Sequence, residues 1–403
     1  DIYYLDADGD GFGDEELVSC SWPEGYATLD GDCDDNNPDV NPRIDEVCNE
    51  TDDDCDGEVD EFVGGFYYTD ADGDGYGTGA ALDLCDPPEG VAERGGDCDD
   101  ANPALTERGI YFDDTLVEFD NGDTYTLPGD GDVTVCKGTW NVRLVADGVT
   151  ATIIGVDGAA TTNLSGGVEA TPLTILDSTV AVEGLTILDG NSDGDGGCVY
   201  VEGSDVTLTD VTVRNCEAAN GGALYLTGST VSMSNGGFRD TSVTGNGGTV
   251  FVEHGPLTLS NVIQSQSKAG TGGAVYVGEG GSVLASGGEV HDCSASDGGG
   301  IAVVGGTWYS SQTTVRANTA QANGGGFFVE DGDVTLVGGK LAANSGSEGG
   351  GLYLSSGAGL VATETDCAQG TSDNSPNDVK PAFGDAVSWE GTCTAICDDS
   401  GCE

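Results

Sequence analysis

The chain has 403 residues, of which 72 are Asp or Glu and 11 are Lys or Arg, so its formal net charge is −61. Such an acidic surface repels phosphate, which excludes nucleic acid as a partner and disfavours binding to an anionic membrane. Fourteen cysteines, no CxxC pair and only two histidines favour disulfides over a zinc site. We therefore expect an exported protein, extracellular or on the outer cell surface, and the sequence has no visible signal peptide or membrane-spanning run.

Residues 1–105 are expected to form an acidic module, because one motif occurs in them twice. The run YYLDADGDGFG at 3–13 recurs as YYTDADGDGYG at 67–77, and GDCDD at 31–35 recurs at 96–100. The first 100 residues hold 33 Asp or Glu and only two basic residues. A charge run is usually a solvated face or tail, but here the aspartates recur at fixed spacings with glycine.

The cysteines of this module are expected to form disulfides within each copy. Two cysteines stand 13 positions apart in both copies, and an additional segment of the first copy, 48–61, contains two more. The predicted disulfides are Cys20–Cys33, Cys85–Cys98 and Cys48–Cys55.

Three stretches of the module have the pattern Asp-x-Asp-x-Asp-Gly, which is typical of a loop that curls around a cation. Positions one, three and five of such a loop donate side-chain oxygens, and position seven donates its backbone carbonyl. Oxygen ligands without histidine or free thiolate select a hard cation over zinc or copper, and a flexible loop favours calcium over magnesium. The sequence therefore predicts several bound calcium ions. The alternative is a metal-free acidic coil, in which carboxylates ~4 Å apart repel by roughly 1 to 4 kcal/mol per pair.

The loops differ from an EF-hand at position twelve, where Leu17, Val63 and Ala81 replace the bidentate Glu. We expect the aspartates of the two GDCDD runs to supply the missing oxygens, so that folding and calcium binding are coupled. The predicted ligands are Asp6, Asp8, Asp10, Phe12, Asp14, Asp32, Asp34, Asp35, Asp52, Asp54, Asp56, Glu58, Asp60, Asp70, Asp72, Asp74, Tyr76, Asp97, Asp99 and Asp100.

The ordered motifs of residues 1–105, YYLDADGDGFGD, GDCDDNNPDVNP and EVCNETDDDCDGEVDE, resemble the metal-binding repeats of MopE-type surface proteins of proteobacteria. They are also similar in kind to thrombospondin type 3 calcium repeats. The resemblance implies export and a cell-surface or extracellular location. Some members of the family are linked to copper, for which this chain has no cluster of histidines or free thiols. The second copy lacks the EVCN and DDDCDG segment, so we do not expect a site equivalent to that of 48–61 in the second copy.

Residues 106–365 carry a second repeat with a period of 25 or 26 residues. So regular a period indicates a solenoid with one coil per repeat, and short alternating strands broken by Gly, Asn and Ser indicate a parallel β-helix. Three less regular coils at 110–190 bring the expected total to about ten. The marker of the repeat, Gly-Gly-small-apolar-aromatic-apolar, begins at Gly196, Gly221, Gly247, Gly272, Gly298, Gly324 and Gly349.

These markers, with degenerate FxxN slots at 315–318 and 341–344, resemble the repeats of polymorphic outer-membrane proteins and related pectin-lyase-like β-helices. The resemblance covers about 190–360 and implies a right-handed β-helix. The predicted fold class is therefore all-β: a right-handed parallel β-helix of about ten coils, with an N-terminal loop-rich calcium-binding module and a disulfide-stapled C-terminal cap. The family includes adhesins, passenger domains and polysaccharide lyases, so the fold alone does not decide the function.

The C-terminal cap is expected at 366–403, where the period breaks. A stacked sheet has an open end that invites pairing with another chain, and a stapled cap would prevent this. Within the β-helix, Cys198 and Cys216 are candidates for a disulfide across adjacent coils, while Cys136 and Cys293 remain unassigned. The cysteines of the cap are Cys367, Cys393, Cys397 and Cys402.

The aromatic position of the marker predicts a column of stacked rings that points away from the β-helix interior. The column can be interpreted as a stack covered by another part of the chain, as a docking stripe for a neighbouring protomer, or as a platform for sugar rings. Its members are Tyr200, Tyr225, Phe251, Tyr276, Phe328 and Tyr353.

We predict no enzymatic activity, because residues 106–403 hold only nine scattered Lys or Arg and two histidines on different coils. The leading hypothesis is a secreted, calcium-stabilised structural or adhesive cell-surface protein, self-assembling into a filament or layer or binding another surface protein. The alternative is a carbohydrate-binding β-helix that uses the aromatic column to hold a polysaccharide, with a polysaccharide lyase less favoured.

Overall fold

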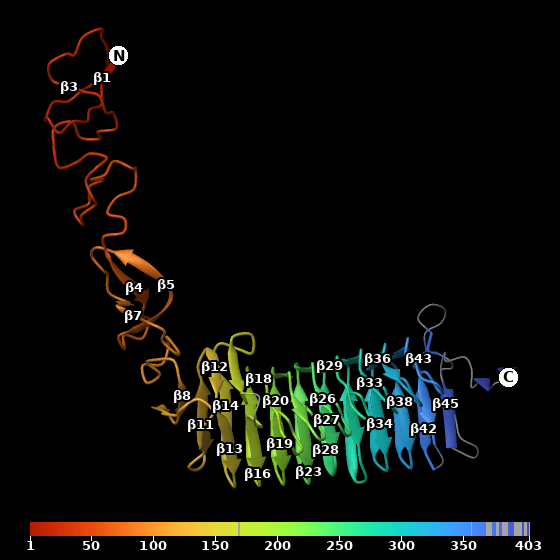
Figure 1. The fold of residues 1–403 in the computed structure, drawn as a ribbon. Coiled ribbons are helices and arrows are strands. Elements are labelled where there is room, and N and C mark those ends of the chain that lie inside the picture. The colour runs from red at the N-terminus through yellow and green to blue at the C-terminus, as the bar shows by residue number, and fades with distance from the viewer. Residues whose placement is uncertain are drawn as a thin grey trace. The chain divides into compact units, whose positions relative to one another are not determined.

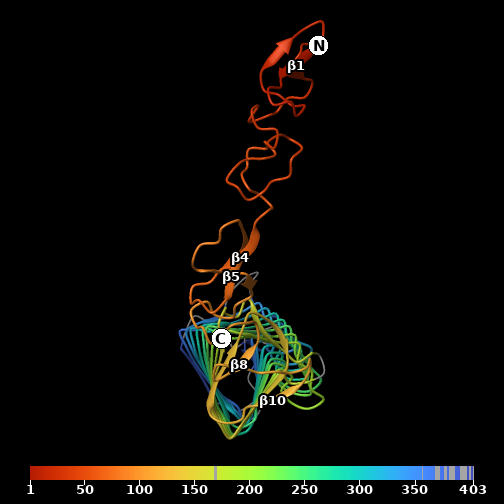
Figure 2. The same ribbon diagram turned by 90° about the vertical axis from the view of Figure 1, so that its left-hand side faces the viewer.

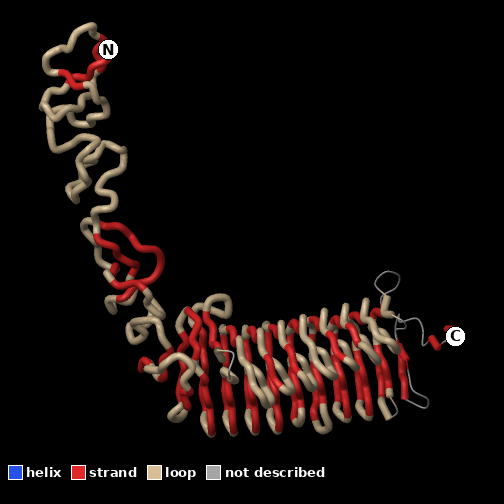
Figure 3. The backbone as a smooth tube through the Cα atoms, in the orientation of Figure 1, coloured by secondary structure: helices blue, strands red, loops and turns tan. Residues whose placement is uncertain are grey.

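The structure is a computed structural model of the chain, and its described residues contain strands and turns but no helix (Figures 1 and 3). It describes residues 1–167, 170–355, 357–367, 373–375, 379–380, 386–390, 397–398 and 401–402. The chain divides into two compact units, Asp1–Arg108 and Gly109–Glu403, where the sequence placed the first boundary between 105 and 106. The segment 366–403, expected as a separate cap, falls within the second unit.

The first unit has one small sheet in each copy of the acidic motif. In the first copy β1 pairs antiparallel with β2 and β3, and in the second copy β4 pairs antiparallel with β5 and β6. The aspartate-rich loops connect β1 to β2 and β4 to β5, so strand pairing holds both ends of each loop. The strands are β1 (Ile2–Leu5), β2 (Glu16–Val18), β3 (Tyr26–Ala27), β4 (Gly65–Thr69), β5 (Tyr76–Leu84), β6 (Val91–Ala92) and β7 (Arg94–Gly95).

The second unit is a parallel β-helix whose coils run through three sheets around one interior, which Figure 2 shows nearly end-on. The first sheet contains β10 (Thr124–Thr126), β13 (Arg143–Asp147), β16 (Leu173–Leu176), β19 (Val199–Glu202), β23 (Leu224–Thr227), β27 (Val250–Val252), β30 (Val275–Val277), β34 (Ile301–Val304), β38 (Phe327–Glu330), β41 (Leu352–Leu354) and β44 (Val379–Lys380).

The second sheet begins with an antiparallel pair, β8 and β9, which covers the N-terminal edge of its otherwise parallel strands. Its strands are β9 (Thr115–Leu116), β8 (Ile110–Phe112), β11 (Gly131–Val135), β14 (Thr150–Gly155), β17 (Thr179–Glu183), β20 (Asp205–Thr209), β24 (Thr230–Ser234), β28 (Gly255–Ser260), β31 (Gly281–Ser286), β35 (Thr307–Ser311), β39 (Asp333–Val337), β42 (Gly359–Thr363) and β45 (Ala386–Glu390).

Within the described part of the chain the third sheet has ten strands, which agrees with the expected number of about ten coils. They are β12 (Gly138–Asn141), β15 (Thr162–Ser165), β18 (Thr186–Leu188), β21 (Thr212–Arg214), β25 (Gly237–Arg239), β29 (Ile263–Ser265), β32 (Glu289–His291), β36 (Thr314–Arg316), β40 (Lys340–Ala342) and β43 (Asp366–Cys367). Short two-stranded sheets are formed by β22 (Glu217–Ala218) with β26 (Ser242–Val243), β33 (Ser294–Ala295) with β37 (Thr319–Ala320), and β46 (Cys397–Asp398) with β47 (Gly401–Cys402).

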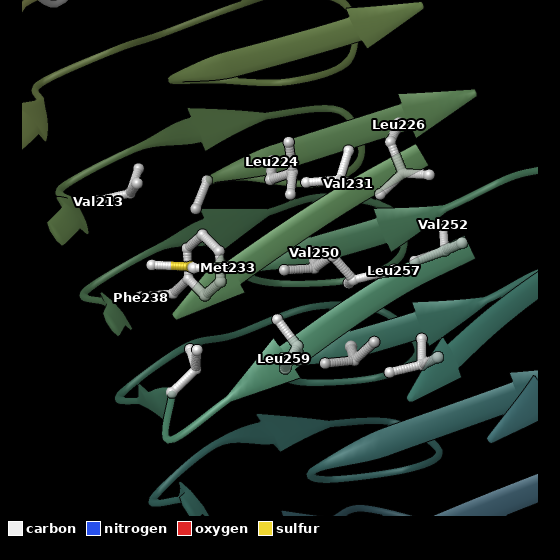
Figure 4. Close-up of a cluster of buried hydrophobic side chains, with 14 of the residues drawn as sticks. Val213, Leu224, Leu226, Val231, Met233, Phe238, Val250, Val252, Leu257 and Leu259 are labelled. Atoms are coloured by element: carbon white, nitrogen blue, oxygen red, sulfur yellow. The ribbon is translucent and has the colours of Figure 1, made fainter. Parts of the chain in front are cut away.

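The core of the β-helix consists of the alternating apolar residues of its strands. Leu224 pairs with Val250 and Leu226 with Val252 in the register of β23 and β27, and all four side chains are fully buried. Figure 4 shows this stack together with Met233 from the second sheet. Because the same pattern repeats in each coil, and burying one such side chain contributes about 1.5–3 kcal/mol, the interior stabilises the fold along its whole length.

The first glycine of each marker is the corner that lets a coil enter the first sheet. These glycines have φ between 56° and 68°, and a Cβ on them would come within 2.0–2.7 Å of a carbonyl oxygen three residues on. Both conditions favour glycine over any other residue, which explains the strict repetition of the marker. The corners are Gly196, Gly221, Gly247, Gly272, Gly298, Gly324 and Gly349.

Buried asparagines join successive coils near the C-terminal end of the β-helix. The amide nitrogen of Asn318 donates to Asn344 Oδ1 (3.0 Å), and that of Asn344 donates to Asn374 Oδ1 (2.9 Å). The Asn344 side chain also donates to Val315 O (2.9 Å). All three asparagines are buried. This ladder satisfies backbone groups that the turns would otherwise leave unpaired.

The predicted disulfide-stapled cap lies outside the described residues. Cys393 is not described, and neither are the side chains of Cys367, Cys397 and Cys402. Among the described residues, no helix is long and apolar enough to cross a membrane.

Candidate metal centre

The first aspartate-rich loop holds its carboxylates by short hydrogen bonds to its own backbone. The amide nitrogen of Gly9 donates to Asp6 Oδ1 (2.8 Å), that of Asp10 to Asp8 Oδ1 (3.1 Å), and that of Phe12 to Asp10 Oδ1 (2.8 Å). Aspartate makes such bonds in tight turns. As a result, one carboxylate oxygen from each of the three aspartates lies within 4.8 Å of the others.

The GDCDD run of the first copy adds two more carboxylates to this loop. Asp35 Oδ1 accepts a hydrogen bond from the amide nitrogen of Ala7 (2.9 Å). Asp32 is only 6% exposed, and the charges of Asp10, Asp8 and Asp35 all act on it. The structure thus brings Asp32 and Asp35 to the first loop, where the sequence expected the missing ligands.

The second copy repeats this arrangement. Gly73 N donates to Asp70 Oδ1 (2.7 Å) and Tyr76 N to Asp74 Oδ1 (2.7 Å), as in the first loop. Asp100 Oδ1 accepts the amide of Ala71 (2.9 Å). Asp97 is buried, and the charges of Asp74, Asp72 and Asp100 act on it. The carboxylates gathered in this copy are Asp70, Asp72, Asp74, Asp97 and Asp100.

Several carboxylate oxygens in the two centres are buried without a hydrogen-bond partner. Their Oδ1 atoms accept backbone N–H groups, and the Oδ2 atoms are left over. A buried, unpaired carboxylate oxygen is costly unless a cation compensates it. Donor sets made only of carboxylate oxygens fit a hard divalent cation. The unpartnered atoms are Asp8 Oδ2 and Asp32 Oδ2 in the first copy, and Asp72 Oδ2, Asp74 Oδ2 and Asp97 Oδ2 in the second.

The crowding raises the pKa of several of these carboxyl groups. Desolvation is the largest cause for Asp97, and together with the charges of Asp74, Asp72 and Asp100 it raises the pKa of Asp97 to about 6. The pKa of Asp32 is raised in the same way, first by desolvation and then by its neighbours. Each centre therefore resists full ionisation until positive charge is supplied.

A third acidic cluster lies in the additional segment of the first copy. The ligand atoms of Asp52, Asp54 and Asp56 lie within 4.8 Å of one another, as do those of Glu46, Asp54 and Glu61. Glu61 Oε2 is buried and has no partner. Asp54 belongs to both groups, so the predicted loop is joined by two glutamates that the sequence pattern did not single out.

Glu46 holds this third cluster in shape. It is buried, and its Oε1 accepts the amides of Asp53 (2.6 Å) and Asp54 (2.8 Å), while its Oε2 accepts that of Asp60 (2.9 Å). Asp60, also a predicted ligand, accepts the backbone amides of residues 49 and 50. No spacing rule pointed to Glu46. The only signal was its place beside the inserted segment.

The remaining predicted ligands lie outside the clusters or contribute through their backbone. Asp14 and Asp34 are exposed, and Asp99 accepts the amide of Ala101 (3.3 Å). Glu58 is exposed and donates its backbone N–H to Asp56 Oδ1 (2.9 Å). Phe12 and Tyr76 donate backbone N–H groups to the loops, and their carbonyls remain predicted ligands.

Each aromatic residue at position seven lies beneath an arginine. Arg43 lies over the ring of Phe12 at 5.2 Å, and Arg94 over that of Tyr76 at 5.4 Å. These two are the only basic residues among the first 100, and they come from different positions in the two copies. Cation–π contacts of this kind contribute about 0.5–1 kcal/mol at exposed sites. The sequence did not predict these contacts, although the scarcity of basic residues in the module was a signal that could have singled out the two arginines.

The disulfides of the module differ from all three that equal spacing predicted. Cys33 pairs with Cys55, and Cys48 pairs with Cys85. Cys20 is a free, exposed thiol, and Cys98 is disulfide-bonded but not to Cys85. The bonds connect the inserted segment to both copies, through Cys33 of the first copy and Cys85 of the second, which are not equivalent positions of the repeat.

In the β-helix, the disulfide Cys198–Cys216 is present as expected. Cys136, which the sequence left unassigned, is also disulfide-bonded. Cys293 is a free thiol buried in the core, and desolvation raises its pKa to about 12.

The predicted aromatic column is present on the first sheet. Tyr200, Tyr225, Phe251 and Tyr276 stack with centroid distances of 5.4, 5.3 and 4.8 Å. The stack is interrupted at Ala302 and resumes where Phe328 and Tyr353 lie 5.8 Å apart. Most of these rings are half-buried, and Tyr225 is only 7% exposed.

Carboxylates accompany the first part of the column. Tyr225 donates its hydroxyl hydrogen to Glu253 (2.8 Å), and Tyr200 to Glu202 (3.0 Å). Burial and these partners raise the pKa of Tyr200 to about 12. The column therefore combines flat apolar rings with carboxylate acceptors.

Two family models match the chain. Residues 175–366 match the right handed beta helix region, and residues 32–61 and 97–106 match the Cu-binding MopE metal-binding motif. The second match includes the DCDD residues of both runs, at 32–35 and 97–100, and the third acidic cluster. No curated protein and no solved structure matches the chain. The chain thus joins a MopE-type metal-binding motif to a right-handed parallel β-helix.

Proposed function

We propose that the protein is an extracellular structural or adhesive protein whose acidic module is held together by several calcium ions. The observation that carries the calcium assignment is the set of buried, unpartnered carboxylate oxygens in both copies. They belong to groups of five carboxylates on short, glycine-containing loops. Without cations these groups repel one another, so calcium and the folded module stabilise each other.

Calcium suits these centres better than copper, although the matching motif is named for copper. The clustered groups are carboxylates, and both histidines lie in the β-helix. Copper(II) and copper(I) favour imidazole and sulfur ligands, whereas flexible carboxylate loops with backbone carbonyls favour calcium. The disulfides support an extracellular location, since they persist in oxidising surroundings.

Isothermal titration of the metal-free full chain with Ca²⁺, Mg²⁺ and Cu²⁺ tests the assignment. We expect calcium to bind most strongly, with the paired variant Asp8→Asn and Asp72→Asn losing most of the binding. Asp205→Asn, which removes an exposed charge from β20, is the matched control and should bind as the unchanged protein does. Copper binding that outcompetes calcium and survives the paired variant would contradict the proposal.

Self-assembly is the second part of the proposal. Solenoids offer sheet edges and long faces on which copies can stack, and the partly exposed aromatic column is a candidate contact. Electron microscopy of the purified protein with and without calcium should show filaments or layers with calcium present. Monodisperse single particles at high concentration in both conditions would refute this part.

The alternative function is carbohydrate binding along the aromatic column. The pairing of stacked rings with Glu202 and Glu253 favours it, because sugars present apolar faces and hydroxyl groups together. Glycan-array screening separates the two functions. Binding that is lost in Tyr200→Ala and Tyr276→Ala would favour the alternative, and an absence of binding would favour assembly.

We also propose that the chain is not an enzyme. Basic residues do gather on the third sheet, where Arg214 pairs in register with Arg239 and His291 with Arg316. A hollow of about 350 Å³ beside Arg239 is lined by serine, threonine, glutamine, glycine and apolar residues, without a carboxylate or histidine. Such a lining supplies no acid–base pair. Incubation with acidic polysaccharides should yield no unsaturated ends, and their appearance would refute the proposal.

A further inference from the structure

The segments that follow the two GDCDD runs differ at a position whose side chain contacts the acidic centre in the first copy. After the shared aspartates, the chain makes the same two turns in both copies. Val40 N donates to Asn37 O (2.9 Å), and Leu105 N donates to Asn102 O (2.9 Å). Val40 and Leu105 are both buried. The next residue is therefore equivalent in the two copies, and it is Asn41 in the first and Thr106 in the second.

Asn41 contacts the metal centre of its own copy. It is 5% exposed, and its side-chain nitrogen donates to Asp10 Oδ2 at 2.6 Å. Its side-chain oxygen accepts the amide of Arg43 (3.0 Å), which fixes the orientation of the amide group. In the second copy, Asp74 is the equivalent of Asp10, and its Oδ2 is buried without a partner.

The contacted oxygen of Asp10 is the one that accepts no backbone amide. In both copies the second and third aspartates of the loop accept backbone amides at Oδ1, as do Asp32 and Asp97, so their Oδ2 atoms are those left for a cation. Three such oxygens are unpartnered in the second copy and two in the first, and Asp10 accounts for the difference. The Asn41 amide thus supplies to Asp10 a partial positive charge that Asp74 Oδ2 receives from no described residue.

We infer that Asn41 makes the first copy a weaker, exchangeable calcium site and leaves the second copy as the tight, structural one. This inference rests on the proposed calcium binding. An ion at the first copy must displace the amide or share its oxygen, whereas an ion at the second copy relieves an unpaired oxygen. Since a hydrogen bond to a charged group is involved, we expect calcium affinities about tenfold apart or more.

The same contact makes the first copy less dependent on the ion for its shape. The Asn41 backbone amide also donates to Asp53 O (2.9 Å), which ties the centre to the inserted segment. As calcium is withdrawn, the second copy should therefore gain more hydrogen exchange than the first. As the calcium concentration rises, the site of the second copy should be occupied first and that of the first copy later.

Hydrogen exchange along a calcium titration of the full chain resolves the two sites. Peptides covering 3–18 report on the first copy and those covering 65–84 on the second. We expect the midpoint of protection to lie at about tenfold higher calcium for the first copy. The reciprocal variants Asn41→Thr and Thr106→Asn should lower the first midpoint and raise the second. Asn36→Ala, which also installs the residue of the second copy but at an exposed position, should change neither.

Each outcome is informative. Equal midpoints in the unchanged protein, or a first midpoint that Asn41→Thr leaves unaltered or raises, would overturn the inference while calcium binding stands. If Asn41→Thr does not fold even with calcium, the midpoints of the unchanged protein and of Thr106→Asn decide whether the inference holds. No calcium-dependent protection in either copy would instead refute the proposed function.

Discussion

Replacing Asp97 by asparagine should stabilise the ion-free module and weaken its calcium binding. Asp97 is 6% exposed, its Oδ1 accepts the amide of Asp99 (3.0 Å), and its Oδ2 has no partner. Asparagine keeps the size of the side chain but removes the charge that Asp72 and Asp74 repel. If Asp97 had a purely structural role, the substitution would change the stability in the same direction with and without calcium.

The magnitude follows from the pKa. A rise in the pKa of Asp97 from 3.8 to about 6 corresponds to at most about 3 kcal/mol of destabilisation at pH 7. Because the pKa is raised, the folded ion-free module binds more protons than the unfolded chain between pH 4 and 6. The contribution of Asp97 to stability is therefore fully present below about pH 4 and is lost as the pH rises through about 6. In Asp97→Asn this dependence should flatten, and the gain at neutral pH should be about 1–3 kcal/mol.

Hydrogen exchange of peptides in 65–105 measures this effect in the full chain, after correction for the intrinsic exchange rate at each pH. Without calcium, Asp97→Asn should exchange more slowly than the unchanged protein at pH 7. With calcium the order should reverse, because the variant lacks one ligand. Glu93→Gln, which removes an exposed charge nearby, is the control. Faster exchange of Asp97→Asn in both conditions would refute the reasoning.

Two further predictions concern the cross-links of the module and the core of the β-helix. Cys55→Ser breaks the bond to Cys33 beside the first centre. It should lower the free energy of unfolding by about 2–4 kcal/mol and weaken calcium binding. Cys20→Ser removes a free thiol and should change neither quantity. Asn344→Ala removes the acceptor of the Asn318 backbone amide and the side-chain donor to Val315 O, and thermal unfolding should show a loss of about 2–4 kcal/mol. A loss under about 1 kcal/mol would mean that the asparagine ladder adds little.

The β-helix could be predicted from the sequence in detail, because its information is local and repeated. The Gly-Gly marker fixes a corner with positive φ, and the alternation after it fixes which side chains point inward. Leu224 and Leu226 are buried as expected, and Tyr225 stacks in its column. The extent to which Tyr225 is covered, at 7% exposure, depends on neighbouring rings and loops, so the local pattern did not contain it.

The aspartate-rich loops were predictable for the same reason, since Asp-x-Asp-x-Asp-Gly describes one continuous turn. The partnership of the first loop with Asp32 and Asp35 followed from the need for more oxygens. Glu46 was not predictable in this way. It acts by accepting three backbone amides from residues that lie 7, 8 and 14 positions away, a role that no ligand spacing encodes.

The disulfides show where reasoning from repeats fails. Equal spacing in two copies indicates that Cys20 and Cys85 occupy equivalent positions, but it does not indicate which cysteines are close in space. Cys85 bonds to Cys48 in a segment that exists only in the first copy, so the symmetry of the repeat is broken there. Cys20 then has no partner and remains a free thiol.

The central claim is that cations among the carboxylates maintain the folded acidic module. Hydrogen exchange of the full chain, measured in calcium and again after removal of calcium with a chelator, tests it most directly. We predict that amides of 1–105 lose protection without calcium while the core strands of the β-helix keep theirs. Unchanged protection of the module after calcium removal would contradict the claim.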